Sequence, residues 1–309
     1  MRPFRFGIQL SRAATPADWR DRARKLEDLG YSTLFMPDHF EDQFGPLVAL
    51  TVAAEATTTL KVGSLVLDND YRHPLVLAKE AATLDLASEG RFEAGIGAGW
   101  MRTDYDQSGI SYDDPSVRVS RLEEAIKVMK ALWADERVDF EGEHYRITGA
   151  HGLPRPHTPG GPPLLIGGGS RRVLRIAVEH ARIIGINPSL RAGFVGPETI
   201  ATASSRHYAE RVDWVRQLAG DRFGELELQS LVFVAEIGRP QKAVAEEMSA
   251  LVGFPPEEIA ASPIGLFGTE DEIVETLLRR RDESGFSYWV LHENEIDGFA
   301  PVVARLAGS

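Results

Sequence analysis

Eight short apolar segments, most of them followed by an amphipathic helical pattern, constrain this sequence of 309 residues more than any other feature. Most are continuous aliphatic and β-branched runs, which is typical of strands buried on both faces. They are Phe4–Leu10, Ser32–Pro37, Lys61–Leu67, Arg91–Gly97, Pro163–Gly167, Arg182–Ile186, Leu228–Glu236 and Ser287–His292. Strands that alternate with helices are parallel and joined by right-handed crossovers. An open sheet would also alternate, but eight such units close more naturally into a barrel. We therefore predict an α/β fold, a single-domain (β/α)8 TIM barrel over residues 1–309.

Capping patterns indicate where several of the helices begin. Thr15–Asp18 combines an N-cap, a proline at the first helical position and an acid at the capping-box position. Ser120–Glu123 and Thr269–Glu272 have the pattern of two further capping boxes, and Pro74 indicates the start of another helix that ends near Gly90.

Two segments interrupt the alternation. Residues 135–162 read as a hairpin, Val138–Phe140 with His144–Ile147, followed by a loop rich in proline and glycine. Residues 238–268 form a long insertion before the seventh helix. Long insertions in a compact barrel are more often lids or binding loops than neutral additions, so we expect both segments to help shape a site.

The composition excludes several classes of function. The net charge is −12, from 34 basic and 46 acidic side chains, so the surface repels phosphate backbones and we expect no nucleic-acid partner. There is no cysteine, and the histidines show no paired ligand spacing, so we expect no metal site. No signal peptide and no run of roughly 20 apolar residues is present, so we expect a cytoplasmic protein without a membrane span.

Candidate functional residues are sought at the carboxyl ends of the strands, where barrel enzymes carry their active sites. Asp38 and His39 end the second run and offer an anion and a proton shuttle, although taken alone they also fit a local cap and local packing. Gly63 and Ser64 lie inside the third run, where glycine indicates either a bulge beside a flat ligand or packing beneath a large neighbour.

Glycines dominate the next two strand ends. Gly97-Ala98-Gly99 lacks side chains that would keep a planar ring from the backbone, and Trp100 stands where a dinucleotide fingerprint needs its third glycine. Gly167-Gly168-Gly169-Ser170 leads directly into a helical pattern, which predicts a phosphate site without a P-loop lysine. Asn187, at the end of the sixth run, is either a polar contact or part of an Asn-Pro turn.

Together these segments resemble the bacterial luciferase-like superfamily of flavin- and deazaflavin-dependent oxidoreductases over essentially the whole chain. The resemblance rests on Pro37-Asp38-His39, Val62–Leu65, Gly97–Trp100 with Arg118, Arg121, Leu122, Glu123 and Glu124, Phe140–Tyr145, Gly167–Ser170 and Phe267–Thr269. Within the superfamily the chain is most similar to an actinobacterial branch that uses coenzyme F420.

The resemblance implies a (β/α)8 barrel that is commonly a homodimer. It places the cofactor ring on a bulge at Ser64-Leu65, often with a non-prolyl cis peptide, Asp38 and His39 beside ring and substrate, and Ala98 and Gly99 against the ring. The segment from Gly168 to Arg171 would hold the phosphate of the cofactor tail. Sugar-phosphate dehydrogenases of this branch carry an acid in place of Trp100, so the resemblance argues against a sugar-phosphate substrate here.

Three hypotheses follow from this resemblance. The first is hydride transfer between coenzyme F420 and a small organic substrate, with His39 as general acid/base. The second is an FMNH2-dependent monooxygenase that receives its reduced flavin from a separate flavin reductase. The triple-glycine turn would hold the phosphate of this cofactor equally well. The third is a barrel that binds flavin without catalysis.

Overall fold

A closed barrel of eight parallel strands forms the centre of the molecule, as the apolar runs predicted. The computed structural model describes residues 2–135 and 137–309. The wall consists of β1 (Arg5–Gln9), β2 (Thr33–Met36), β3 (Lys61–Ser64) with its continuation β4 (Leu67–Asp68), β5 (Phe92–Gly97), β8 (Leu164–Gly168), β9 (Ile183–Ile186), β10 (Glu227–Leu231) and β13 (Phe286–His292). Pairing of β3 with β5 and of β1 with β13 closes the ring, so the carboxyl ends of all strands meet at one mouth.

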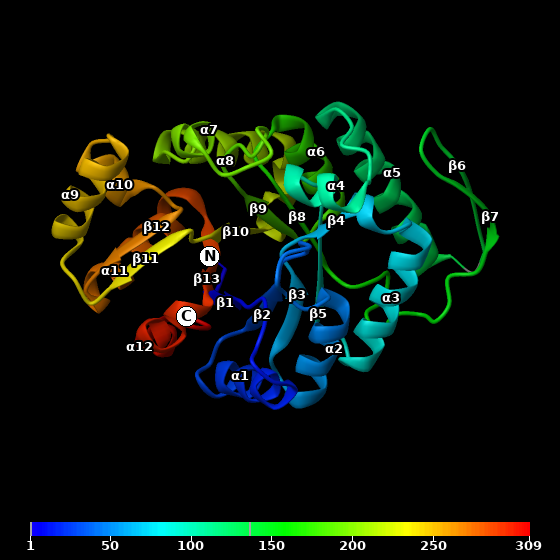
Figure 1. Ribbon diagram of the computed structural model, residues 1–309, viewed down its shortest axis with the longest axis horizontal. Helices are drawn as coiled ribbons and strands as arrows, with labels where there is room; N and C mark the ends of the chain where they lie inside the picture. Colours follow the sequence, from blue (N-terminus) through cyan, green and yellow to red (C-terminus); the bar gives the residue numbers. More distant parts are fainter. Residues whose placement is uncertain (1, 136) are drawn as a thin grey trace.

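Helices surround this barrel (Figure 1). They are α1 (Pro16–Asp28), α2 (Pro46–Ala56), α3 (Pro74–Ala87), α4 (Arg102–Ser108), α5 (Pro115–Ala134), α6 (Arg171–His180), α7 (Pro197–Ala201), α8 (Ser205–Ala219), α9 (Gln241–Val252), α10 (Pro256–Ala261), α11 (Glu270–Ser284) and α12 (Ile296–Leu306), with short 3-10 turns at Asn69–Tyr71, Gly220–Glu225 and Glu293–Glu295. Among the described residues, none of the helices has the length and apolar character needed to cross a bilayer.

The predicted helix starts are confirmed in three of four cases, among them Pro74, which begins α3. The Thr15 side chain accepts a hydrogen bond from the Asp18 amide at the start of α1, and Thr269 and Glu272 form a reciprocal capping box at the start of α11. The prediction at Ser120 was wrong, because Pro115 already begins α5 and Ser120 lies inside that helix. A proline at the first helical position is the stronger signal there.

The two insertions extend from opposite sides of the barrel (Figure 1). The predicted hairpin is formed by β6 (Val138–Glu141) and β7 (Arg146–Ala150), which pair antiparallel. The second insertion contains α9, α10 and β12 (Gly265–Gly268), which pairs in a two-stranded parallel sheet with β11 (Val234–Ile237) just before the insertion. The predicted seventh run therefore combined a barrel strand with the first strand of this separate sheet.

The barrel interior is packed with side chains below the mouth. Phe35, Leu165, Ile183, Tyr288 and Val290 form a buried cluster separate from the larger core between strands and helices. Such a filled interior is typical of this fold and leaves only the mouth for a ligand.

A buried ionic network lies at the opposite end of the barrel, where the strands begin. Arg5 forms an ion pair with Glu93 and another with Glu227, at 2.8 Å between Nη1 and Oε2. The Tyr288 hydroxyl donates to Glu93 Oε2 at 2.9 Å, and Glu93 is 1% exposed. Burial of the charged guanidinium is tolerated because both carboxylates neutralise it.

We predict that Glu93→Ala lowers the free energy of unfolding by about 3 kcal/mol, because it leaves the buried part of Arg5 undercompensated. Urea denaturation measures this loss. The exposed carboxylate of Glu179, paired with Arg175 on α6 at 3.2 Å, offers a matched control, and Glu179→Ala should change stability by less than about 0.5 kcal/mol. Equal losses in the two variants would show that the network contributes nothing specific.

Candidate active site

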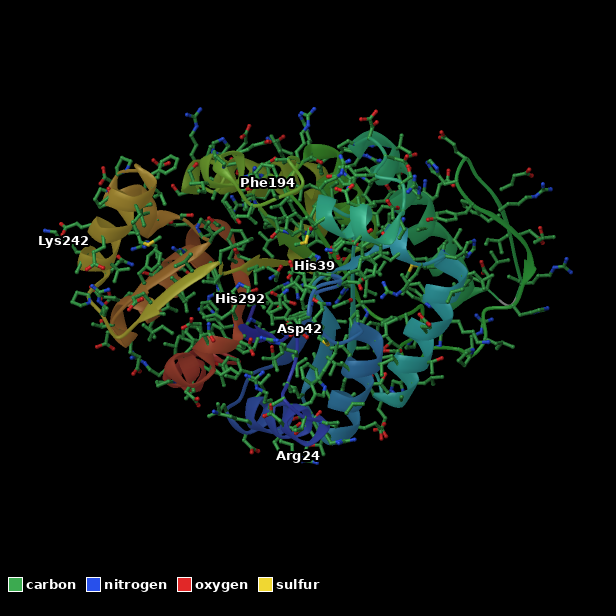
Figure 2. All side chains as sticks on the ribbon, viewed as in Figure 1. Arg24, His39, Asp42, Phe194, Lys242 and His292 are labelled. Atoms are coloured by element: carbon green, nitrogen blue, oxygen red, sulfur yellow. The ribbon has the colours of Figure 1, made fainter. Side chains whose placement is uncertain are left out.

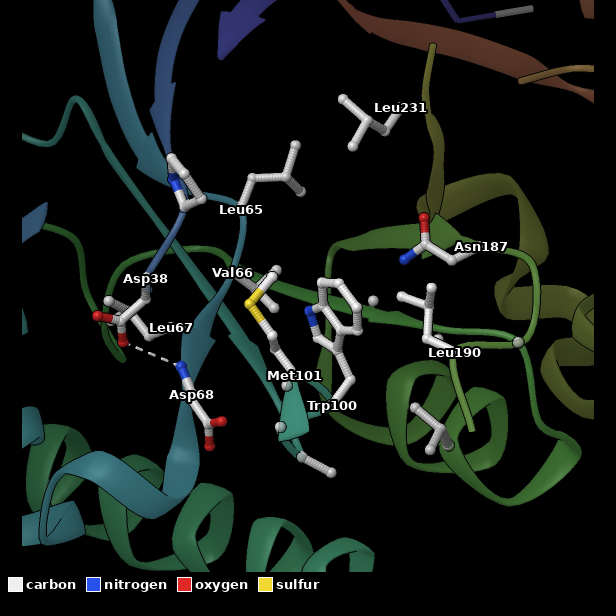
Figure 3. Close-up of a pocket in the computed structure, with 18 of the residues that line it drawn as sticks. Asp38, Leu65, Val66, Leu67, Asp68, Trp100, Met101, Asn187, Leu190 and Leu231 are labelled. Atoms are coloured by element: carbon white, nitrogen blue, oxygen red, sulfur yellow. Dashed lines mark hydrogen bonds between the residues drawn. The ribbon is translucent and has the colours of Figure 1, made fainter. Parts of the chain in front are cut away.

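A cavity of about 520 Å³ opens at the mouth of the barrel and is lined mainly by residues at or after the carboxyl ends of the strands. Figure 3 shows side chains from several strand ends facing this space. The predicted residues on its wall are Asp38, His39, Leu65, Gly97, Ala98, Gly99, Gly167, Gly168, Gly169, Ser170 and Asn187. A volume of this size suits a small-molecule or cofactor ligand.

Three predicted residues are not on the wall. A Cβ at Gly63 would come within 2.5 Å of the Phe35 ring, so this glycine accommodates a large neighbour, as the packing alternative required. Ser64 is fully buried, and its hydroxyl donates to the Gly95 carbonyl at 2.8 Å. Arg171 is exposed at the first position of α6. None of the three lines the cavity, and the contacts of Gly63, Ser64 and Arg171 with a cofactor stay predictions.

The kink of the third strand falls between β3 and β4. The cis peptide is Leu65-Val66, one residue later than the bulge we expected at Ser64-Leu65. The Leu65 amide donates to the Met36 carbonyl at 2.7 Å, and the Gln9 side-chain amide donates to the Leu65 carbonyl at 3.0 Å. These bonds hold the kink against the neighbouring strands, and the side chains of Leu65 and Val66 line the cavity.

His39 is oriented by an acid that sequence reasoning missed. Its Nδ1 lies 2.7 Å from Oδ2 of Asp104, a buried residue of α4. The same oxygen accepts from the Tyr71 hydroxyl at 3.1 Å. Because a carboxylate only accepts, the pair holds the ring proton on Nδ1 and leaves Nε2 for a ligand. A histidine in this arrangement can exchange a proton with a substrate.

Asp38 is bound on both oxygens of its carboxylate. Both of its oxygens are bound by the Arg72 guanidinium, at 3.0 Å between Nη2 and Oδ1, and Oδ2 also accepts from the Asp68 amide at 3.1 Å. The paired guanidinium holds this carboxylate in one orientation. Asp38 thus positions the loop that carries His39, and its catalytic role stays a prediction.

Asp68 is a second acid on the cavity wall, also missed in the sequence. Its carboxylate accepts from the Tyr105 hydroxyl at 3.0 Å and from the Asp70 amide at 2.9 Å. The pKa of Asp68 is raised to about 7, mainly by burial and also by the nearby charges of Asp70 and Asp38, while the two hydrogen bonds partly oppose the shift. The charge of the cavity wall is thus expected to change near neutral pH.

This shift predicts a pH-dependent stability. Between pH 4 and 7 the folded chain keeps the Asp68 proton that the unfolded chain has lost, so the free energy of unfolding falls as pH rises, by about 1.4 kcal/mol per unit. Asp68→Asn has no such proton. We expect the stability of the wild type relative to this variant to fall across that window, as measured by denaturation at each pH. A constant difference would contradict the shift.

The triple-glycine turn leads into α6 at the far side of the cavity. Ser170 caps the helix, its hydroxyl accepting from the Val173 amide at 3.3 Å. The first amides of a helix have no partner within it and attract anions. A Cβ at Gly169 would lie 2.4 Å from the Asn187 carbonyl oxygen, and buried Arg211 donates to the Gly169 carbonyl at 3.0 Å. The turn therefore requires glycine and is held in one shape.

Apolar side chains form much of the remaining wall. Figure 3 shows Leu65, Trp100, Met101 and Leu190 around the same space. The Trp100 indole also packs edge-on against the His39 ring, with centroids 5.7 Å apart. An apolar wall beside His39 and the triple-glycine turn suits a ligand with a flat apolar part and a phosphorylated arm.

Fold and site thus define a (β/α)8-barrel protein with a cavity of ligand size at its C-terminal mouth. The chain belongs to the luciferase-like monooxygenase family, which matches residues 1–235. This confirms the resemblance seen in the strand-end residues.

Known proteins similar to the chain differ in the reactions their names describe. An F420-dependent glucose-6-phosphate dehydrogenase of Nakamurella multipartita is 30% identical over 313 aligned positions, which cover 94% of this chain and 91% of the relative. The chain spans about half the length of the first curated relatives it matches. The F420-dependent tetrahydromethanopterin reductase of Methanopyrus kandleri is 17% identical (TM-score 0.78, covering 98% and 99% of the two chains). A long-chain alkane monooxygenase is 15% identical (TM-score 0.76, 99% and 91%), so the structural likeness shows the fold alone.

Proposed function

We propose that the chain is an oxidoreductase that transfers a hydride between coenzyme F420 and a small organic substrate. The observation that carries this proposal is the pairing of His39 with Asp104, 2.7 Å apart, in the same cavity as the triple-glycine turn. A proton-transferring group and an anion-binding turn are the two protein parts that such a reaction needs. The names of curated relatives, F420-dependent dehydrogenases, support the choice of cofactor.

The residues present fit a deazaflavin cofactor. Its ring would lie against Leu65, Val66 and the Gly97–Gly99 segment, and its phosphate at the turn Gly167–Ser170, whose glycines leave no side chain in the way. When bound, the cofactor supplies or accepts the hydride. The chain supplies orientation, an apolar wall that excludes water and a fixed proton carrier.

His39 gives or takes the proton of the substrate oxygen, depending on the direction of the reaction. A carbonyl substrate reduced to an alcohol gains a hydride at carbon and a proton at oxygen, and the proton comes from Nε2 of the protonated ring. In the reverse direction Nε2 takes the proton of the hydroxyl group. Asp104 stabilises the charged ring in both directions.

The substrate is expected to differ from the sugar phosphates of the curated relatives. Trp100 takes the place of an acid in that branch, and Met101 and Leu190 extend an apolar wall beside it. Desolvating a sugar phosphate against such a wall is unfavourable.

An FMNH2-dependent monooxygenase is the second candidate, because the triple-glycine turn would hold the phosphate of FMN equally well. The requirement for oxygen separates the two candidate functions. We expect carbonyl acceptors to oxidise reduced F420 in the absence of oxygen, and the change in the visible absorbance of F420 measures this reaction. Turnover only with FMNH2 and oxygen, and none with F420, would overturn the first proposal.

The family resemblance also supports a cytoplasmic homodimer as a proposal. Light scattering of the purified protein tests the dimer, and a mass of one chain would contradict it.

A further inference from the structure

A second cavity of about 220 Å³ lies between the barrel and the insertion that carries α9 and α10. We call it the insertion groove. Its walls come from the Val195–Ser204 segment, the sheet of β11 and β12, α9 and α10. The apolar side chains that line it are Val195, Ile200, Phe233, Val234, Met248, Val252, Phe254, Ile259, Ile264 and Phe267.

Polar groups on the groove wall are already engaged. The Ser262 hydroxyl donates to the Ala203 carbonyl, and the Ser204 hydroxyl lies 2.7 Å from Nδ1 of His207. The Thr199 hydroxyl accepts from the Gly196 amide. Glu258 is the single ionisable side chain among the lining residues. A ligand would therefore find apolar surface rather than hydrogen-bonding partners, which favours an apolar one.

The groove is adjacent to the active-site cavity. Val195 and Phe233 line both. Phe233 stands where the chain leaves the barrel, and its amide donates to the Ile264 carbonyl at 2.8 Å. Val195 is 56% exposed, and in the view of Figure 2 the adjacent Phe194 lies above His39, with Lys242 at the outer end of the insertion on the left. Val195 and Phe233 therefore place the groove next to the cavity that contains His39.

A buried arginine fixes the groove floor. Arg280 of α11 is 5% exposed and donates to the carbonyls of Gly265, Ser262 and Ala260, at 3.0, 2.8 and 3.1 Å. These carbonyls belong to the segment from the end of α10 to the start of β12. The Arg280 guanidinium would be costly to bury without such partners. The wall of the groove is therefore fixed to α11 as an integral part of the fold.

We propose that the insertion groove binds the apolar tail of the substrate, an alkyl or arylalkyl chain attached to the carbonyl or carbinol carbon that reacts beside His39. The proposal rests on the proposed function for its reacting group. It depends on its own observations for the tail, namely the apolar wall, the engaged polar groups and the two shared residues. Burial of each additional methylene group would add to affinity until the chain exceeds the groove.

The test uses linear 2-alkanones from 2-butanone to 2-dodecanone as probes, with binding measured by calorimetry on the full chain. We expect the wild-type affinity to rise about three- to fourfold per methylene group and then level off. Met248→Glu, which places a charge on the groove wall, should remove most of this rise and leave 2-butanone unaffected. Leu251→Glu is the matched control, because Leu251 lies on the same helix, is 79% exposed and does not line the groove. It should behave as the wild type.

Unchanged chain-length dependence in Met248→Glu would overturn the inference. So would the conversion of a dimer to a monomer by this variant with ketone binding unchanged, since the groove would then be an interface between copies. Ile259→Glu on α10 repeats the test if Met248→Glu does not fold by circular dichroism. Titration of the same samples with F420 separates the two proposals. Loss of F420 binding would contradict the proposed function. A ketone affinity that does not change with chain length would contradict the proposed role of the groove.

Discussion

His39→Ala lowers the rate constant of hydride transfer by about 10²- to 10⁴-fold and leaves F420 affinity almost unchanged. The expected loss follows from removing the ring whose Nδ1 is held 2.7 Å from Asp104 and whose Nε2 exchanges the proton with the substrate. Stopped-flow oxidation of reduced F420 by a 2-alkanone under anaerobic conditions measures the rate, and a fluorescence titration measures the affinity.

Two further variants serve as comparisons for the His39→Ala result. Asp104→Asn keeps the histidine ring but removes the charge behind it, so we expect a smaller loss of rate. His157→Ala removes an exposed histidine that does not line the cavity, and should leave the rate unchanged. If His39→Ala retained the full rate, another group would carry the proton. A wild type that binds F420 but never turns over would instead favour a non-catalytic barrel.

Gly169→Val should weaken F420 binding by about 10- to 100-fold, the equivalent of losing one charge-assisted hydrogen bond to the phosphate. A Cβ at this position would lie 2.4 Å from the Asn187 carbonyl oxygen, so the turn before α6 must shift. The measurement is a fluorescence titration at constant ionic strength.

Gly224→Ala is the matched glycine control. A Cβ there has nothing within 4 Å and the backbone needs no left-handed conformation, so affinity should stay that of the wild type. Unaltered F420 affinity in Gly169→Val would place the phosphate away from this turn. The cavity offers a different anion partner in Arg191, and Arg191→Met would then be the variant that weakens binding.

The barrel was predictable because its signal is local. Each strand is a short continuous apolar run, and the glycine-rich ends of β5 and β8 are adjacent to those runs in the chain. Parallel strands carry their carboxyl ends to one mouth, so the order of the runs was enough to bring His39, Ala98 and Gly168 together. The split of the seventh run was missed because Leu231 and Val234 belong to equally apolar segments that pair with different sheets.

The acids of the site were not predictable from local patterns. Asp104 meets His39 because α4 follows β5 and turns back over the mouth, a contact across 65 positions of sequence. Asp38 appeared free next to His39, but Arg72 binds its carboxylate from the segment before α3. The cis peptide lies one residue after the predicted position, because the sequence alone does not show which amide of β3 is the last to pair with β2.

Separate equilibrium titrations of the purified protein with F420 and with FMN test the central claim, that the cavity at the barrel mouth holds a deazaflavin. We predict saturable binding of F420, tighter than that of FMN, with quenching of Trp100 fluorescence that is lost in Trp100→Phe. Tighter binding of FMN, or no saturable binding of F420 to folded protein, would contradict it.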